Sequence, residues 1–281
     1  MSRSLIPDVK DEPYGPHVRN TFDLWLVEDP PPAPLLLWIH GGGFARGDKS
    51  GFSTQMKDAC LDAGIAFGAV NYRFSTTAPY PAPMHDCARA VQTIRHNAAR
   101  WNLDPTRLAA TGGSAGAGIS LWLAFHPDLA DPDSPDPVAR QSTRTSAAIA
   151  TNAQCSYDPR FVRELVPGNA YDEVHLKLLV GMPEDTDWDV TEVDERLDAL
   201  LTDCASITHL GPDSPPVFVM HSIANEKPGD IHHPNFGRHL KAEMDKLGIE
   251  CIRRMDTDYP PGASPSFVDD SVAFLRRVFG M

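Results

Sequence analysis

The sequence predicts an α/β fold in which a mostly parallel sheet is covered by helices on both faces. Three observations lead to this class. Short apolar runs of strand length alternate with longer stretches of helical periodicity. The 281 residues suffice for one large domain with a buried core, and a hydrophobic content of 42% is ordinary for a globular protein. We therefore expect a single domain over residues 1–281, with a mostly helical insertion at about residues 156–213 that covers the sheet as a cap.

In the first half of the chain, the pattern predicts three strands and two helices. Residues 18–27 alternate around Phe22 and Leu24, which is typical of an antiparallel strand at a sheet edge. A proline-rich turn at 28–34 leads into a buried strand at 35–39. The other expected elements are a helix at 52–61, a strand at 65–72 and a long helix at 81–101.

The second half repeats the alternation of strands and helices after an acidic, proline-rich loop at 128–137. That loop is most simply a solvated connection. The expected elements are strands at 145–155, 217–221 and 250–255, and helices at 235–247 and 266–279.

Charge and the first residues limit the class of protein. A formal net charge of −13 argues against nucleic acid and anionic membrane surfaces as partners. No apolar run is long enough for membrane insertion, and the first residues lack a hydrophobic signal region. The sequence as it stands predicts a cytoplasmic protein, or the mature form of a secreted one, that acts on a small molecule. Its oligomeric state is not readable from these patterns.

The five cysteines predict neither a metal centre nor a disulfide framework. They are scattered, odd in number and without a C-x-x-C pair, so buried thiols are the simplest interpretation. We expect no metal and no organic cofactor.

A G-x-S-x-G pentapeptide, Gly112 to Gly116, stands between an apolar strand and an apolar helix. In this motif the serine, here Ser114, occupies a sharp strand-to-helix turn, and small neighbours avoid collisions there. A second motif, H-G-G-G at 40–43, follows the strand at 35–39. Such a turn supplies backbone N–H groups for an oxyanion hole, here Gly42 and Gly43, together with that of Ala115.

These motifs resemble those of α/β-hydrolases of the esterase and lipase group, including bacterial carboxylesterases and feruloyl or acetylxylan esterases. The run Gly43–Ser50 is also similar to one in kynurenine formamidases. The resemblance covers nearly the whole chain and implies an α/β-hydrolase fold with a small helical cap. It further implies that Arg73 and Asp86 have structural roles, and that an acidic residue often stands where this chain has Gly113.

The resemblance also implies a catalytic acid after the strand that ends at His221, often in the pattern H-G-x-x-D-x-x-V-P. This chain reads H-S-I-A-N-E-K-P-G-D-I-H-H-P. Counting forward from His221 gives Asn225, whereas counting back from Pro234 gives Asp230. We favour Asp230 as the acid, with Glu226 in reserve.

The catalytic histidine is expected in loop 256–265, and that loop contains none. One interpretation is that His232 or His233 is the base, oriented by Asp230 or by an aspartate of loop 256–265. A second is that no histidine reaches Ser114, so that the protein is a weak hydrolase or binds a ligand in the old pocket. A third is an unusual base such as Asp258, or loss of the site.

From these motifs we predict a carboxylesterase that works through an acyl-serine intermediate at Ser114. Two alternatives stay open: a catalytically impaired ligand-binding protein on the same scaffold, and an amidase or formamidase.

Overall fold

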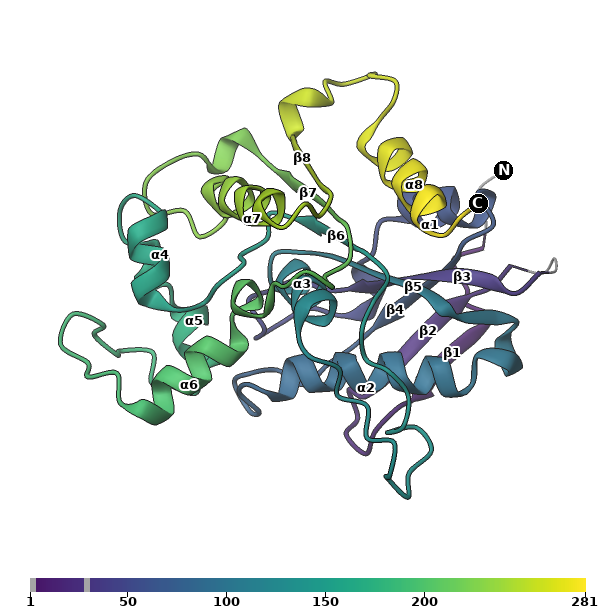
Figure 1. Ribbon diagram of the computed structural model, residues 1–281, viewed down its shortest axis with the longest axis horizontal. Helices are drawn as coiled ribbons and strands as arrows, with labels where there is room; N and C mark the ends of the chain where they lie inside the picture. The colour runs from purple at the N-terminus through teal and green to yellow at the C-terminus, as the bar shows by residue number, and fades with distance from the viewer. Residues whose placement is uncertain (1–3, 28–30) are drawn as a thin grey trace.

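The core of the fold is an eight-stranded sheet with the order β1-β2-β4-β3-β5-β6-β7-β8 (Figure 1). The computed structural model describes residues 4–27 and 31–281. The strands are β1 (Val9–Pro13), β2 (Thr21–Trp25), β3 (Ala33–Ile39), β4 (Ala66–Val70), β5 (Leu103–Gly113), β6 (Ala148–Thr151), β7 (Val217–His221) and β8 (Cys251–Met255). β2 is antiparallel to both β1 and β4, and all other neighbours are parallel. The predicted mostly parallel α/β fold is confirmed.

Helices connect the parallel strands, as such connections require. They are α1 (Thr54–Asp62), α2 (Ala82–His96), α3 (Ala115–Phe125), α4 (Pro159–Leu165), α5 (Val174–Leu179), α6 (Glu195–Cys204), α7 (Asn235–Lys246) and α8 (Phe267–Val278). Short 3-10 turns are η1 (Lys49–Gly51), η2 (Ala98–Trp101), η3 (Ala170–Asp172), η4 (Ser206–His209), η5 (Ile223–Asn225) and η6 (Asp256–Asp258). The long helix expected at 81–101 is therefore α2 followed by a separate turn, η2.

Alternate side chains of the central strands serve two different layers of helices. On β3, Leu35 and Leu37 belong to the apolar cluster that includes residues of α2, whereas Leu36 between them packs with residues of α1 and α8. Figure 1 shows α1 and α8 side by side on one face of the sheet and α2 on the other. Because both faces are covered, β3 and β4 are apolar along their length, which is the pattern of buried parallel strands.

The N-terminal edge of the sheet differs from the prediction. The expected strand at 18–27 is present as the antiparallel β2, but it does not lie at the edge, because β1 pairs along its outer side. β1 has the sequence V-K-D-E-P and is largely exposed, so it carries almost no apolar signal. In the proline-rich turn that follows β2, residues 28–30 lie outside the described part of the chain.

Arg73 and Asp86 have the structural roles that the resemblance implied. The guanidinium group of Arg73 contacts both carboxylate oxygens of Asp86, at 2.6 Å from Nη2 to Oδ1 and 2.9 Å from Nε to Oδ2. Asp86 also accepts a hydrogen bond from Asn20 Nδ2 at 2.9 Å. These contacts tie α2 to the chain that follows β4.

The segment between β6 and β7 contains α4, η3, α5, α6 and η4. Figure 1 shows α4, α5 and α6 gathered at one end of the molecule, beyond β6 and β7. The segment is mostly helical, as expected, while its division from the rest as a cap at 156–213 stays a prediction. All five cysteines are buried and unpaired. Within residues 4–27 and 31–281, no helix has the length and apolarity needed to cross a bilayer.

Candidate active site

Ser114 stands at the tip of the turn from β5 into α3, in a strained backbone conformation. Its φ of 53° and ψ of −123° lie in a region that residues other than glycine rarely adopt. The backbone bonds around it are regular: the Ser114 N–H donates to the Thr151 oxygen at 2.9 Å, and the Gly118 N–H donates to the Ser114 oxygen at 3.0 Å. The turn therefore holds the hydroxyl at the carboxyl edge of the sheet.

Two glycines of this turn are required by close backbone contacts. A Cβ atom on Gly112 would lie 2.5 Å from the Ile39 oxygen, and one on Gly116 would lie 2.1 Å from the same atom. β5 and α3 can thus approach the end of β3 only without side chains at these two positions. Gly113 is different, because a Cβ there would meet its nearest neighbour, the Thr151 oxygen, at 3.9 Å.

The H-G-G-G turn after β3 lies directly beside the serine. Gly42 and Gly43 have φ values of 101° and 60°, which favour glycine. Among the described residues, no hydrogen bond takes the N–H of either one. The N–H of Ala115 opens α3 and has no partner within the helix. All three residues line one pocket together with Ser114, so their N–H groups are candidate donors for an oxyanion in that pocket.

His40 fixes the H-G-G-G turn. Its ring stacks on Tyr72 with centroids 4.1 Å apart, and the Tyr72 hydroxyl donates to the His40 backbone oxygen at 2.9 Å. Arg19 Nη2 lies 3.0 Å from His40 Nε2, so this nitrogen accepts and the Nδ1 proton points to the Gly41 oxygen at 2.8 Å. Burial lowers the pKa of His40 to about 4. A neutral histidine fully engaged in this way supports the turn and is not available as a base.

His232 is the histidine that reaches the serine. Its Nε2 lies 2.8 Å from Ser114 Oγ. Asp230 stands two residues earlier in the same loop, with Oδ1 3.5 Å from His232 Nδ1, longer than a normal hydrogen bond. The same oxygen accepts the backbone N–H of His232 at 2.9 Å, which fixes the turn that presents the ring. The structure thus brings Ser114, His232 and Asp230 together.

His233 and Glu226 do not join this group. His233 is 5% exposed, and its Nδ1 accepts the backbone N–H of Asn235 at 3.1 Å, at the start of α7. Glu226 pairs with Arg238 at 2.6 Å.

The aspartates of loop 256–265 are also occupied elsewhere. Asp256 accepts hydrogen bonds from the Ser222 hydroxyl at 2.5 Å and the Ile223 N–H at 2.8 Å. Asp258 accepts the Met255 N–H at 2.9 Å. Loop 256–265 therefore supports the start of the neighbouring loop after β7. The loop after β7 is the one that carries the imidazole of His232.

The pocket at Ser114 has a volume of about 290 Å³ and includes two residues that the sequence did not indicate, Glu173 and His175. His175 packs on the oxyanion turn, because a Cβ on Gly43 would lie 2.1 Å from its Cδ2. Its Nδ1 contacts Glu173 Oε1 at 2.7 Å. Both come from the helical segment at 156–213, where no local motif marks them. Of the aromatic residues in that segment, Tyr157 also lines the pocket.

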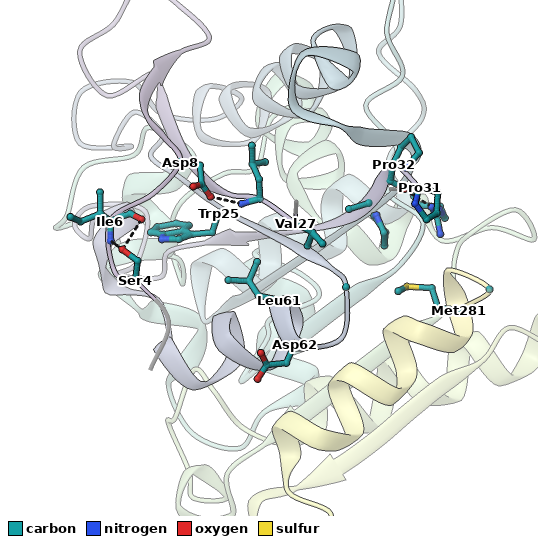
Figure 2. A pocket seen from close by; sticks show the side chains of 16 residues that line it. Ser4, Ile6, Asp8, Trp25, Val27, Pro31, Pro32, Leu61, Asp62 and Met281 are labelled. Carbon is teal, nitrogen blue, oxygen red and sulfur yellow. Dashed lines mark hydrogen bonds between the residues drawn. The ribbon is translucent and has the colours of Figure 1, made fainter. Parts of the chain in front are cut away.

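A larger cavity, of about 850 Å³, lies at the other end of the strands, where β3 begins. Figure 2 shows its lining by Trp25, Leu61 and Met281, together with residues near the N-terminus. No residue of the group around Ser114 lines it. The larger cavity is therefore not the one that holds the candidate site. The contact between Ser114 and His232 marks the smaller pocket instead.

Residues 23–227 match the BD-FAE family. The chain belongs to this family. The matched region includes both glycine-rich motifs and ends three residues before Asp230, so the loop segment with Asp230 and His232 falls just outside it. Membership of BD-FAE confirms the resemblance to α/β-hydrolase esterases that the motifs indicated.

Curated relatives of this BD-FAE chain include mycobacterial esterases. A probable carboxylic ester hydrolase, LipM of Mycobacterium tuberculosis, is 28% identical over 75% of this chain and 46% of its own length. Esterase LipQ of the same organism is 28% identical over 78% of this chain and 49% of its own length. The chain spans about half the length of these curated relatives.

Solved structures with the same fold include carbohydrate-active enzymes. A truncated carbohydrate esterase from gut microbiota superposes with a TM-score of 0.73 at 18% identity, over 96% of this chain and 95% of the other. An acetyl ester-xyloside bifunctional hydrolase from Caldicellulosiruptor lactoaceticus gives a TM-score of 0.69 at 18% identity, over 92% and 87% of the two chains. These similarities confirm the α/β-hydrolase fold.

Proposed function

We propose that this BD-FAE protein hydrolyses small carboxylic esters through an acyl-serine intermediate. The observation that carries the proposal is the 2.8 Å contact between Ser114 Oγ and His232 Nε2. A serine hydroxyl needs such a proton acceptor to become a nucleophile at neutral pH. The names of LipM and LipQ as ester hydrolases support the same reaction class.

In the first half of the reaction, Ser114 Oγ attacks the ester carbonyl carbon while His232 Nε2 takes the hydroxyl proton. The carbonyl oxygen becomes an anion, and the N–H groups of Gly42, Gly43 and Ala115 stabilise its charge. The bond to the alcohol oxygen then breaks, and His232 returns the proton to that oxygen. The alcohol leaves, and the acyl group stays on Ser114.

In the second half, water attacks the acyl carbon and gives a proton to His232. The bond to Ser114 Oγ then breaks, the hydroxyl recovers its proton, and the carboxylic acid leaves. In both halves Asp230 stabilises the imidazolium ion and favours the tautomer with a proton on Nδ1. The distance of 3.5 Å between Asp230 Oδ1 and His232 Nδ1 would shorten when the ring becomes charged.

The size of the pocket favours short substrates. Its volume of about 290 Å³ is at the lower end of the range for small-molecule sites. It is lined on the side of the helical segment by Tyr157, His175 and Leu176. We infer that acetyl and similar short acyl esters are accepted, with the alcohol group extending toward solvent.

The test compares two neighbouring histidines. We expect wild-type protein to hydrolyse p-nitrophenyl acetate, and Ser114→Ala and His232→Asn to lower kcat/KM at least about 10³-fold. His233→Asn is the matched control: asparagine keeps a side-chain acceptor for the Asn235 N–H, so we expect kcat/KM within about threefold of wild type.

Loss of activity in His233→Asn with retention in His232→Asn would overturn the assignment of the base. Absence of turnover in wild-type protein that still binds short esters would favour the ligand-binding alternative. The amidase alternative is tested by p-nitroacetanilide, which carries the same acyl group on an amide, and we expect its turnover to be far slower.

A further inference from the structure

A second group of side chains with ligand chemistry lies away from Ser114, at the other end of α3. His126, Asp203 and His209 each offer one ligand atom, and these atoms lie within 4.8 Å of one another. His126 follows directly after α3, Asp203 lies near the end of α6 and His209 ends η4. Because α3 has 11 residues, the group is separated from Ser114 by about 16 Å of helix.

The spacing of the three atoms suits one small metal ion. Asp203 Oδ1 lies 3.4 Å from His126 Nε2 and 3.7 Å from His209 Nε2. Two ligands at bond lengths of about 2.0–2.1 Å in a tetrahedral site are roughly 3.3 Å apart. The two histidine nitrogens lie within 4.8 Å of each other, so the coordination is completed if the two rings move closer together around the ion.

Neighbouring groups already orient two of the ligands. His126 Nδ1 lies 2.8 Å from the Pro127 oxygen, which places the ring proton there and leaves the Nε2 lone pair free. The Tyr80 hydroxyl donates to Asp203 Oδ2 at 2.5 Å, which leaves Oδ1 as the available oxygen. The ring of His126 also stacks on Trp122 with centroids 3.9 Å apart. Outer contacts of this kind are typical of metal-binding histidines and carboxylates.

His209 needs a change of tautomer, and a turn of its ring away from a carbonyl oxygen, to bind a metal. Its Nε2 lies 2.8 Å from the backbone oxygen of Asp203, so in this conformation Nε2 carries the proton. Metal binding requires the proton to move to Nδ1. The Asp203 oxygen keeps a partner when this happens, because Trp122 Nε1 also donates to it at 3.0 Å.

Exposure and electrostatics also fit a bound cation. The side chains of His126 and His209 are 11% and 14% exposed, whereas that of Asp203 is 50% exposed, so water can supply a fourth ligand from the carboxylate side. The C-terminal end of α3 carries partial negative charge, which favours a cation beside it. Two imidazoles and a carboxylate are ligands that Zn²⁺ prefers.

We propose that His126, Asp203 and His209 bind Zn²⁺, and that the ion fastens the segment from α6 to η4 onto the C-terminal end of α3. The cysteines and the local spacing of other ligand residues predicted no metal. Here 77 residues separate His126 from Asp203, so no local motif could mark the site.

Zinc binding is tested by titrating the chelator-treated 281-residue chain with ZnCl₂ in a calorimeter. We expect saturable binding of about one equivalent with a Kd in the micromolar range or below. At a free Zn²⁺ concentration of 100 times Kd, we expect Tm to rise by about 5 °C. Co²⁺ in place of Zn²⁺ should give the visible absorption of a tetrahedral site.

Variants distinguish zinc binding at this site from zinc binding by other histidines. His126→Phe keeps a ring against Trp122 but removes the ligand, and Asp203→Asn keeps an acceptor for Tyr80 but removes the charge. We expect both to lose the bound equivalent and the Tm rise. His96→Gln, at an exposed histidine, is the control and should keep both. The proposal would be overturned if one equivalent of Zn²⁺ still bound to His126→Phe and Asp203→Asn but not to His232→Asn. Absence of saturable Zn²⁺ binding to the wild-type protein would overturn it as well.

Discussion

Glycine is needed at two positions of the turn around Ser114 and dispensable at a third. Gly116 allows α3 to pass the end of β3, where an added Cβ would lie 2.1 Å from the Ile39 oxygen. Gly113 occupies a site with room for a side chain, since its nearest neighbour would be 3.9 Å away. The open space agrees with the acidic residue that the resemblance implied at this position.

We expect Gly116→Ala to lower the unfolding free energy by several kcal/mol and to abolish ester hydrolysis, because neither backbone segment can give way. Gly113→Ala should change the unfolding free energy by less than about 1 kcal/mol. Urea unfolding and p-nitrophenyl acetate turnover, measured on both variants, check this difference. Equal effects of the two substitutions would contradict it.

The sequence could not choose between His232 and His233 because adjacent side chains differ only in where the turn directs them. That direction depends on the Asp230 carboxylate, which accepts the N–H of His232, and on His233, which accepts the N–H of Asn235. Neither contact leaves a periodic signal. Ser114 and the glycines of the H-G-G-G turn could be singled out from the sequence because their backbone geometry demands particular residue types at fixed spacing.

Among the helices, α5 has the most direct influence on the pocket. It carries His175, which packs on Gly43, and Leu176 next to it also lines the site. His175 thus limits the space above the oxyanion turn.

We expect His175→Ala to lengthen the acceptable acyl chain. The ratio of kcat/KM for p-nitrophenyl octanoate to that for the acetate should rise about tenfold, because the removed ring leaves room for added methylenes. Glu173→Gln keeps the shape beside His175 and should leave the ratio unchanged. An unchanged chain-length profile in His175→Ala would show that this ring does not limit the pocket.

Elements with strong apolar patterns were predictable, and exposed or tertiary ones were not. β3, β4 and β7 were expected within a few residues because buried parallel strands are continuously apolar. β1 was missed because its residues are mostly polar and its place is set by pairing with β2. The contribution of α5 to the pocket depends on how the 156–213 segment folds over the sheet, which no local pattern encodes.

Over the whole molecule, the two most deeply buried histidines couple stability to pH. His40 is 2% exposed and His221 is 1% exposed. Burial lowers the pKa of each to about 4 in the folded state, whereas in the unfolded chain each titrates near pH 6.5. The unfolded state therefore binds more protons between these values, and stability rises with pH across this range.

We expect the unfolding free energy to be highest above pH 6.5 and to fall as pH decreases toward 4, by up to about 3 kcal/mol for each histidine. Urea unfolding at steps of pH measures the slope. His221→Asn should make the decrease between pH 6.5 and 4.5 clearly smaller, because it removes one of the groups that bind a proton on unfolding. A free energy that stays constant over this interval would contradict the prediction.

His232 and its carboxylate neighbour share a single loop, so the proposed mechanism assigns no step to the peptide that joins β8 to α8. At Gly262, in the middle of that peptide, an added Cβ would meet nothing within 4 Å. Gly262 itself has a φ of 81°, which favours glycine, so it would be kept and the addition made beside it. We expect a fluorophore, an affinity tag or a carrier module inserted there to leave the proposed ester hydrolysis intact.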